Sequence, residues 1–104
     1  MPASRARLPE RSVLVLTSLA GGDKHGYALI KDIEAFSGIT LGPGTLYGAL
    51  GRLEREGLVE AQPPVDRRLP YRITAEGRTR LHAHLSESAR IAAFGLDRIA
   101  MRRT

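Results

Sequence analysis

The side chains that most often carry metal or nucleophilic chemistry are few in this sequence. It contains three histidines and no cysteine. His82 and His84 are two positions apart, so on a helix they would face different directions and make a poor pair of metal ligands. The lack of cysteine excludes disulfides, thiolate metal sites and a cysteine nucleophile. The sequence therefore predicts no metal site.

The carboxylates do not indicate an enzyme either. Glu54, Glu56 and Asp97 could act as acids or bases, but no nucleophile and no clustered carboxylate pair accompanies them. Residues 42–44 (GPG) lack the lysine and serine that follow the glycines of a phosphate loop. We therefore expect solvated helix charges, no catalysis and no cofactor. His25, in the tetrapeptide KHGY, is expected to be a structural or capping residue.

The stretch GPGTLYGALGRLEREGL, from 42 to 58, indicates a different chemistry. Its leucines at 46, 50 and 53 fall on one side of a helix. The residues on the other side and its flanks are small or can donate hydrogen bonds: Gly44, Thr45, Tyr47, Gly48, Gly51, Arg52 and Arg55. Glycine inside an exposed helix costs about 1 kcal/mol relative to alanine. Two such glycines suit a helix whose backbone approaches the DNA major groove; the alternative is neutral change on a solvated surface.

The net charge of +5 is unevenly distributed. Residues 1–64 contain seven basic and seven acidic side chains, whereas residues 65–104 contain nine arginines and four acids. A one-sided basic excess is expected of a protein that binds nucleic acid. However, fourteen of the sixteen basic residues are arginine, which a GC-rich genome would also favour. Charge alone therefore does not decide the partner.

Three helices are expected within residues 9–57. The first spans about 9–20 and is ended by two glycines, although its β-branched valines leave a strand as the alternative. The second spans 26–37, with an apolar stripe and Gly38 just after its end. That stripe consists of Leu29, Ile30, Ile33 and Phe36. The third begins at Pro43, since proline suits the first helical position, and ends at Gly57.

A hairpin and a long helix are expected to follow. Residues 59–62 and 69–73 can pair as strands, joined by PPVDRR. Thr74 then caps a helix from 75 to about 101. A seam with coiled-coil spacing runs along it: Leu85, Ala89, Ala92, Leu96 and Ile99. Ile91, Phe94 and Met101 lie on roughly the opposite side. A helix that is apolar on two sides predicts packing on its own domain and on a second subunit; the alternative is a helix enclosed in its own core.

Together these elements predict a mainly α fold with a small β-hairpin, namely a winged helix-turn-helix followed by a long C-terminal dimerisation helix. The expected division is a flexible basic arm over 1–8, the winged helix-turn-helix over 9–74 and the dimerisation helix over 75–104. The third helix would enter the major groove. No apolar run approaches the length of a membrane span, and no signal peptide is evident, so we expect a cytoplasmic protein with no membrane partner.

Three segments resemble the PadR family of winged-helix transcriptional regulators. They are HGYALIKDIE (25–34), LGPGTLYGALGRLEREGLVE (41–60) and YRITAEGRTRL (71–81). The resemblance implies a homodimer that represses transcription by binding a palindromic DNA operator. Several members of the family release DNA when a small, often aromatic, effector binds. The resemblance also implies that the last helix packs against the first and last helices of the partner subunit.

The resemblance also assigns roles to residues of this chain. The recognition surface would comprise Pro43, Gly44, Thr45, Tyr47, Gly48 and Arg52; Tyr27 and Lys31 would lie near phosphates, and Arg67 and Arg68 would form the wing contact. Gly42 replaces the capping side chain common in the family, and Leu69-Pro70 makes the wing less basic. Without tryptophan, an effector pocket would use Ile91, Phe94 and Met101. The alternative function is a winged-helix module that docks on protein instead of DNA.

Overall fold

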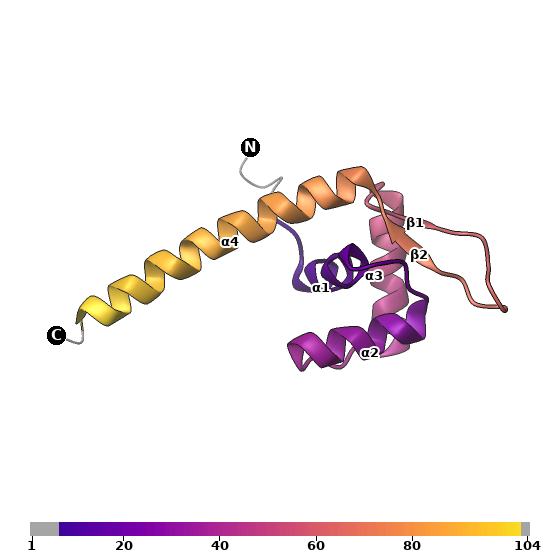
Figure 1. The fold of residues 1–104 in the computed structure, drawn as a ribbon, viewed down its shortest axis with the longest axis horizontal. Coiled ribbons are helices and arrows are strands. Elements are labelled where there is room, and N and C mark those ends of the chain that lie inside the picture. Colours follow the sequence, from indigo (N-terminus) through magenta and orange to yellow (C-terminus); the bar gives the residue numbers. More distant parts are fainter. Residues whose placement is uncertain (1–6, 103–104) are drawn as a thin grey trace.

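The structure, a computed structural model, describes residues 7–102. Its elements follow one another as α1 (Glu10–Ala20), α2 (Gly26–Ser37), α3 (Pro43–Arg55), β1 (Val59–Ala61), β2 (Tyr71–Ile73) and α4 (Ala75–Arg102). Figure 1 shows α1, α2, α3 and the hairpin grouped together, with α4 extending away from them. The predicted mainly α fold with a small hairpin and a long last helix is confirmed.

The helix ends lie close to those expected. Pro9 is the N-cap of α1, so that helix begins one residue later, at Glu10. Helix α3 has its last helical residue at Arg55 and its C-cap at Glu56. Gly57 follows with a φ of 78°, a left-handed conformation that glycine accepts without strain, and it ends the helix as predicted. Gly38, with a φ of 77°, ends α2 as predicted.

The two strands are shorter than predicted. They pair antiparallel over three residues each, with Val59 opposite Ile73 and Ala61 opposite Tyr71. Pro70 cannot donate to a strand ladder, although its carbonyl still accepts the Gln62 N–H at 2.8 Å. On the other edge of β2, Lys24 and Tyr71 exchange backbone hydrogen bonds of 3.2 and 2.9 Å. The loop before α2 is thereby fixed to the hairpin.

One leucine-rich core lies between the first three helices and the hairpin. Its fully buried side chains come from the first three helices, from β1 and from the residue just before it: Val15, Leu16, Leu19, Leu29, Ile33, Leu46, Leu50, Leu53, Leu58 and Val59. Helix α1 is central, since it contacts α2, α3, α4 and β2. Phe36 departs from the predicted apolar stripe of α2, because 47% of its surface is exposed.

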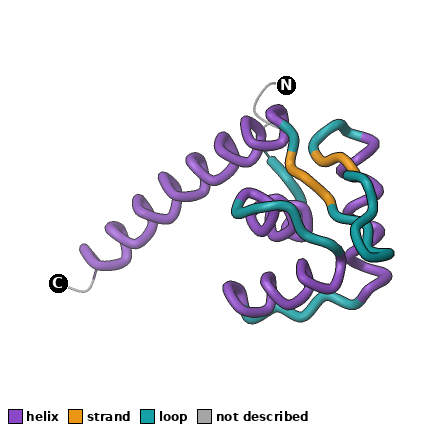
Figure 2. Tube along the Cα trace, turned by 45° about the vertical axis from the view of Figure 1, so that its right-hand side comes forward, coloured by secondary structure: helices purple, strands orange, loops and turns teal. Residues whose placement is uncertain are grey.

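Helix α4 leaves the body soon after it begins. Thr74 caps it as predicted, since its Oγ1 accepts the Gly77 N–H at 3.0 Å. Gly77 and Leu81 are the only buried residues of α4. The radius of gyration is 15.7 Å, against about 13 Å for a compact chain of this length. Figure 2 shows the rest of α4 projecting beyond the other elements.

The predicted arm over residues 1–8 falls mostly outside the described residues, which begin at Arg7. Leu8, by contrast, is 8% exposed and belongs to the core. Its backbone N–H donates to Nδ1 of His84 at 3.1 Å, which fastens the start of the chain to α4. Within the part of the chain that the structure describes, no helix is both long enough and apolar enough to cross a membrane.

Candidate nucleic-acid interface

Helix α3 has the two contrasting sides that its sequence predicts. Leu46, Leu50 and Leu53 are at most 1% exposed and fasten the helix to the core. The predicted recognition residues Pro43, Gly44, Thr45, Tyr47, Gly48 and Arg52 are all exposed. Burial of one side therefore presents the other side, with its small and hydrogen-bonding residues, to a partner.

The glycines of this surface have no packing role inside the molecule. A Cβ atom added at Gly44 or Gly48 would meet nothing within 4 Å among the described residues. At Gly51 it would meet only the flexible end of Arg55, at 3.6 Å. Alanine would fit at Gly44 and Gly48 and has a higher helix propensity than glycine. The fold itself therefore does not require glycine at these two positions.

A shallow crevice runs between this surface and the beginning of α1. It encloses about 280 Å³, and the α1 side contributes Pro9, Arg11 and Ser12. The α3 side contributes Gly44, Thr45, Gly48, Ala49 and Arg52. The glycines allow the crevice to reach the helix backbone. Arg11 was not among the predicted interface residues, because no local pattern links it to α3.

Tyr47 is more constrained than the sequence suggested. It is 51% exposed, but a Cβ at Gly26 would overlap its hydroxyl oxygen. The tyrosine therefore lies against the first residue of α2, and Gly26 is required for that close approach. Arg52 is also engaged, because its Nε lies 3.4 Å from the Glu56 carboxylate one turn away. Such an exposed pair is worth less than about 1 kcal/mol, so Arg52 can readily exchange it for a phosphate or base.

Tyr27 and Lys31 lie together on the outer side of α2. Tyr27 is 65% exposed, and the Lys31 Nζ is 5.8 Å from the centre of its ring. This cation–π contact holds a positive charge beside a hydroxyl on an exposed helix face. Both groups are suitable donors to phosphate oxygens.

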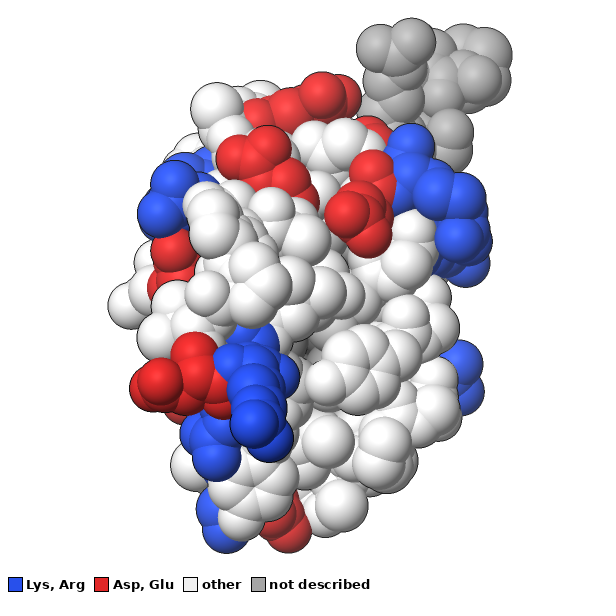
Figure 3. Space-filling model, turned by 90° about the vertical axis from the view of Figure 1, so that its right-hand side faces the viewer, with Lys and Arg blue, Asp and Glu red and all other residues white. Residues whose placement is uncertain are grey.

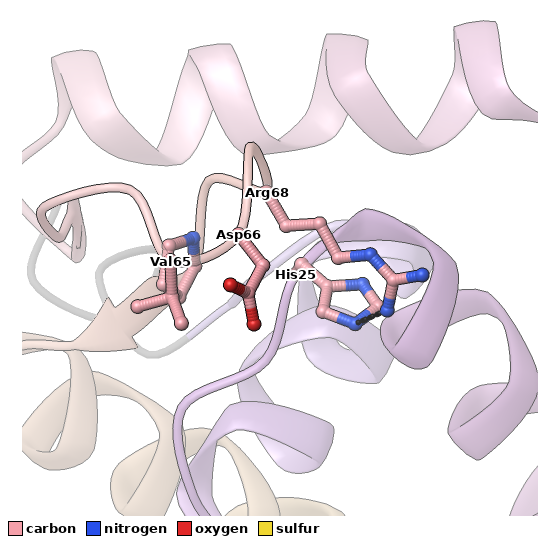
Figure 4. Close-up of a pocket in the computed structure, with 5 residues that line it drawn as sticks. His25, Val65, Asp66 and Arg68 are labelled. Carbon is pink, nitrogen blue, oxygen red and sulfur yellow. Dashed lines mark hydrogen bonds between the residues drawn. The ribbon is translucent and has the colours of Figure 1, made fainter.

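The hairpin ends in a tight two-residue turn. Val65 and Arg68 exchange two backbone hydrogen bonds of 2.8 Å, and Asp66 and Arg67 between them have φ angles of 50° and 68°. Positive φ at both central residues is the signature of a type I′ turn, which suits the twist of a hairpin. Arg67 is exposed at this turn. Figure 4 shows Arg68 directed toward His25, at the start of α2.

Two contacts that sequence reasoning missed connect the hairpin to the start of α2. The Arg68 Nη1 lies 3.1 Å from the His25 Nε2 (Figure 4). Arg72 donates through Nε and Nη2 to the Asp23 carboxylate in three hydrogen bonds, the shortest of 2.9 Å, and this bonding raises the pKa of Arg72. His25 also caps α2, since its Nδ1 accepts the Ala28 N–H at 3.3 Å. The prediction that His25 is a capping residue is confirmed.

Basic side chains do not form one continuous patch on the face that carries the hairpin. Figure 3 shows lysine and arginine in separate groups there, with acidic side chains among them. The basic excess of residues 65–104 is spread over the hairpin and the whole length of α4. Binding of an anionic partner would therefore depend on individual contacts.

The predicted dimerisation seam is exposed along α4. Leu85, Leu96 and Ile99 are 41, 67 and 63% exposed, and Ala89 and Ala92 are exposed as well. The second apolar side is exposed too, with Ile91 and Phe94 at 59% and Met101 at 69%. The Arg98 guanidinium lies 4.5 Å from the centre of the Phe94 ring.

The residues predicted for an effector pocket are not brought together in one cavity. Ile91 lines an open hollow with Arg7, His84, Glu87, Ser88 and Ala92, whereas Phe94 and Met101 lie further along α4, outside that hollow. Within residues 7–102 no group of three or more histidine, aspartate or glutamate side chains is placed so that it could hold a metal ion.

Comparison with known proteins shows that this chain is similar to transcriptional regulators. The model of the family described as "Transcriptional regulator PadR-like family" matches residues 15–83. A protein in transposon TN4556 of Streptomyces fradiae, described as an uncharacterized 37.1 kDa protein, is 43% identical over 86 residues. That alignment covers 83% of this chain but 25% of the transposon protein.

Two solved structures illustrate the similarity of the fold. A PadR family transcription regulator of Clostridium difficile matches with a TM-score of 0.78 and 25% identity, over 88% of this chain and 99% of that one. RosR of H. salinarum matches with a TM-score of 0.70 and 25% identity, over 90% of this chain and 96% of that one.

Proposed function

Because the chain belongs to the PadR-like family of transcriptional regulators, we propose that it is a homodimeric repressor that binds a palindromic operator. Membership of that family supports a function as a DNA-binding regulator of transcription, and not as an enzyme. Repression, the symmetry of the operator and control by an effector are the further parts of the proposal.

The observation that carries the proposal is the exposed side of α3. Its leucines are buried, while Gly44 and Gly48 leave open space where a side chain would stand. A helix of this kind can bring its backbone close to base edges, and Thr45 and Arg52 supply hydrogen-bond donors at its two ends. Pro43 and Tyr47 complete the surface proposed to lie in the major groove.

The proposed phosphate contacts surround this helix. Tyr27 and Lys31 of α2 offer a hydroxyl and an ammonium group on one side. On the other side, the hairpin turn offers Arg67 and Arg68, which would follow the backbone or enter the neighbouring minor groove. Such contacts fix the register of the protein on DNA, and the bases read by α3 provide the specificity.

The proposed dimer forms through α4. The seam of Leu85, Ala89, Ala92, Leu96 and Ile99 is apolar and exposed in the single chain. Aliphatic residues at this spacing pack well against a second helix of the same kind. A two-fold dimer presents two copies of α3 in opposite directions, and for that reason the operator is proposed to be a palindrome.

The proposed effector is a small aromatic or otherwise apolar molecule bound beside α4. Ile91, Phe94 and Met101 give this side of the helix its apolar surface, and the hollow next to Ile91 is open. A ligand that enters between paired subunits would change the separation of the two recognition helices, which would release the operator.

Fluorescence anisotropy with the DNA immediately upstream of the chain's own gene tests the proposal. The labelled duplex is compared with a scrambled duplex of the same composition, at about 50 and about 200 mM salt. We expect tight binding to the upstream duplex that weakens with salt, and much weaker binding to the scrambled one. Addition of small aromatic compounds to the bound complex then tests for release by an effector.

Equal and weak binding to both duplexes would contradict an operator at that position. A complete lack of binding at low salt would contradict the proposal itself and favour docking on another protein. A matched variant, Arg52→Gln, keeps a shorter polar side chain with an N–H donor and removes its charge. It should weaken binding to the upstream duplex more than binding to the scrambled one, because a base contact matters only where the correct base is present.

A further inference from the structure

The two ring nitrogens of His25 have incompatible roles in the folded chain. Nδ1 lies 3.3 Å from the Ala28 backbone N–H, and Nε2 lies 3.1 Å from the Arg68 Nη1. Both neighbours are hydrogen-bond donors, because neither a backbone N–H nor a guanidinium can accept. A neutral imidazole has only one nitrogen lone pair available, since its other nitrogen carries a hydrogen. His25 can therefore satisfy either the helix cap or Arg68, but not both.

Protonation of His25 would remove both bonds at once. The imidazolium has two N–H donors and no acceptor, so it would oppose Arg68 with a like charge. The pair would then consist of two cationic donors side by side at the join between the hairpin and α2. An anion would relieve that conflict, because it accepts hydrogen bonds from both groups and also offsets their positive charges.

The space between these residues is open to such an anion. His25 and Arg68 line a hollow of about 470 Å³, together with Val65, Asp66 and Pro70. Figure 4 shows the side chain of Asp66 directed into the same space as the His25 ring. The Asp66 carboxylate is the negative charge that the chain itself provides in this hollow. It would repel a second anion that binds there.

We propose that this hollow is a proton-linked phosphate site for the DNA backbone, in which protonated His25 and Arg68 donate to one phosphate and Asp66 opposes it. The site deepens the proposed function, and the identity of its ligand rests on DNA binding by the chain. It adds His25 to the wing contact and makes that contact depend on pH. Affinity for DNA should rise as pH falls, because the phosphate favours the protonated histidine.

The other charged groups near His25 are already engaged. The Lys24 ammonium donates to the Ser18 carbonyl at 2.6 Å and lies 3.9 Å from Asp32. The Asp23 carboxylate accepts from Arg72. From α3, the Tyr47 hydroxyl lies against Gly26, and from α2, Lys31 lies over Tyr27. Arg68 and Asp66 therefore remain as the charged groups that share the hollow with His25.

The experiment measures binding of the full chain to a mixed-sequence duplex at low salt, at about pH 6 and about pH 8, where histidines change charge. Non-specific DNA is a suitable probe because phosphate contacts dominate its binding. Wild-type protein should bind about three to ten times more tightly at the lower pH, as expected for uptake of up to one proton. His25→Asn should lose this difference, because asparagine caps a helix but takes up no proton.

Two further variants test the roles of the neighbours. Asp66→Asn should bind more tightly at both pH values, and it keeps the turn, since asparagine adopts positive φ readily. His82→Asn is the matched control: it removes an exposed histidine of α4 and should leave the pH dependence of the wild type unchanged. The same pH dependence in His25→Asn as in the wild type would overturn the inference while leaving DNA binding intact.

Inorganic phosphate distinguishes a backbone phosphate from a free one. Replacement of chloride by inorganic phosphate at equal ionic strength should leave the pH-dependent part of DNA binding in place. If inorganic phosphate abolishes that part even at a saturating concentration of duplex, the hollow prefers free phosphate, and the assignment to the DNA backbone is overturned. A lack of DNA binding at either pH would overturn the proposed function and this inference together.

Discussion

Gly48 is the residue at which one substitution should change stability and DNA binding in opposite directions. Its position in α3 has open space for a methyl group, so Gly48→Ala should stabilise the folded chain by up to about 1 kcal/mol. The same methyl group would stand between the helix backbone and a base edge, so binding to the upstream duplex should weaken. Urea denaturation measures the first effect and anisotropy the second. A variant that is more stable and binds DNA as well as the wild type would show that the glycine has no role in recognition.

Tyr71 should make the stability of the fold sensitive to alkaline pH. It is 8% exposed, and burial, followed by the charges of Glu54 and Tyr47, raises the pKa of its hydroxyl above the usual 10.0. The unfolded chain therefore loses this proton first as pH rises. Folding stability is then fully present below about pH 10 and falls above it, by up to about 1.4 kcal/mol per pH unit.

Tyr71→Phe tests this contribution, because it keeps the ring and removes the proton. Its free energy of unfolding, from urea denaturation at a series of pH values, should fall less steeply above about pH 10 than that of the wild type. Tyr27→Phe, at an exposed tyrosine, is the matched control and should behave as the wild type does. Equal slopes for all three proteins would mean that burial of Tyr71 does not perturb its ionisation.

Among the elements, the start of α4 depends on the close approach of Leu58, the residue before β1. A Cβ at Gly77 would overlap the Leu58 carbonyl oxygen and lie 2.8 Å from Ile73 Cγ1. That carbonyl is held in place, because it accepts the Thr74 N–H at 3.0 Å. Gly77→Ala should therefore destabilise the fold by about 1–3 kcal/mol in urea denaturation. Gly48→Ala is the control for alanine in a helix, and equal stabilisation by both changes would show that the backbone relaxes at no cost.

The elements were predictable wherever their signals are local. Pro43, Gly38 and Thr74 mark helix ends by their own conformational preferences, and the leucine spacing of α3 identifies its buried side. The contacts between elements could not be predicted from local patterns, because the partners are distant in sequence. Arg68 and His25 are 43 residues apart, and Arg72 and Asp23 are 49 residues apart. Arg11 lines the crevice beside α3, and this position was not predicted for the same reason. Phe36 follows the periodicity of α2 but projects beyond the neighbours that cover Leu29 and Ile33.

For the whole molecule, the exposed seam of α4 predicts self-association. Leu96 is 67% exposed, so Leu96→Asp should disturb the single chain little. In a dimer it would bury a charge, which is strongly unfavourable. Light scattering after size exclusion should give the mass of two chains for the wild type and of one chain for the variant. Ser86→Asp introduces the same charge on another side of α4 and should remain dimeric; a dimeric Leu96→Asp would mean that the seam is not the interface.

The projection of α4 also has a mechanical consequence. The helix has 28 residues and is about 42 Å long, yet its buried residues and its bond to Leu8 all lie in the first three turns, at Gly77, Leu81 and His84. A rotation of a few degrees at that anchor would displace the far end by several ångströms, so α4 acts as a lever. Substitutions near its tip could therefore alter the distance between the two DNA-reading units of a pair. Related chains could acquire operators with different half-site spacing while the residues that touch the bases stay the same.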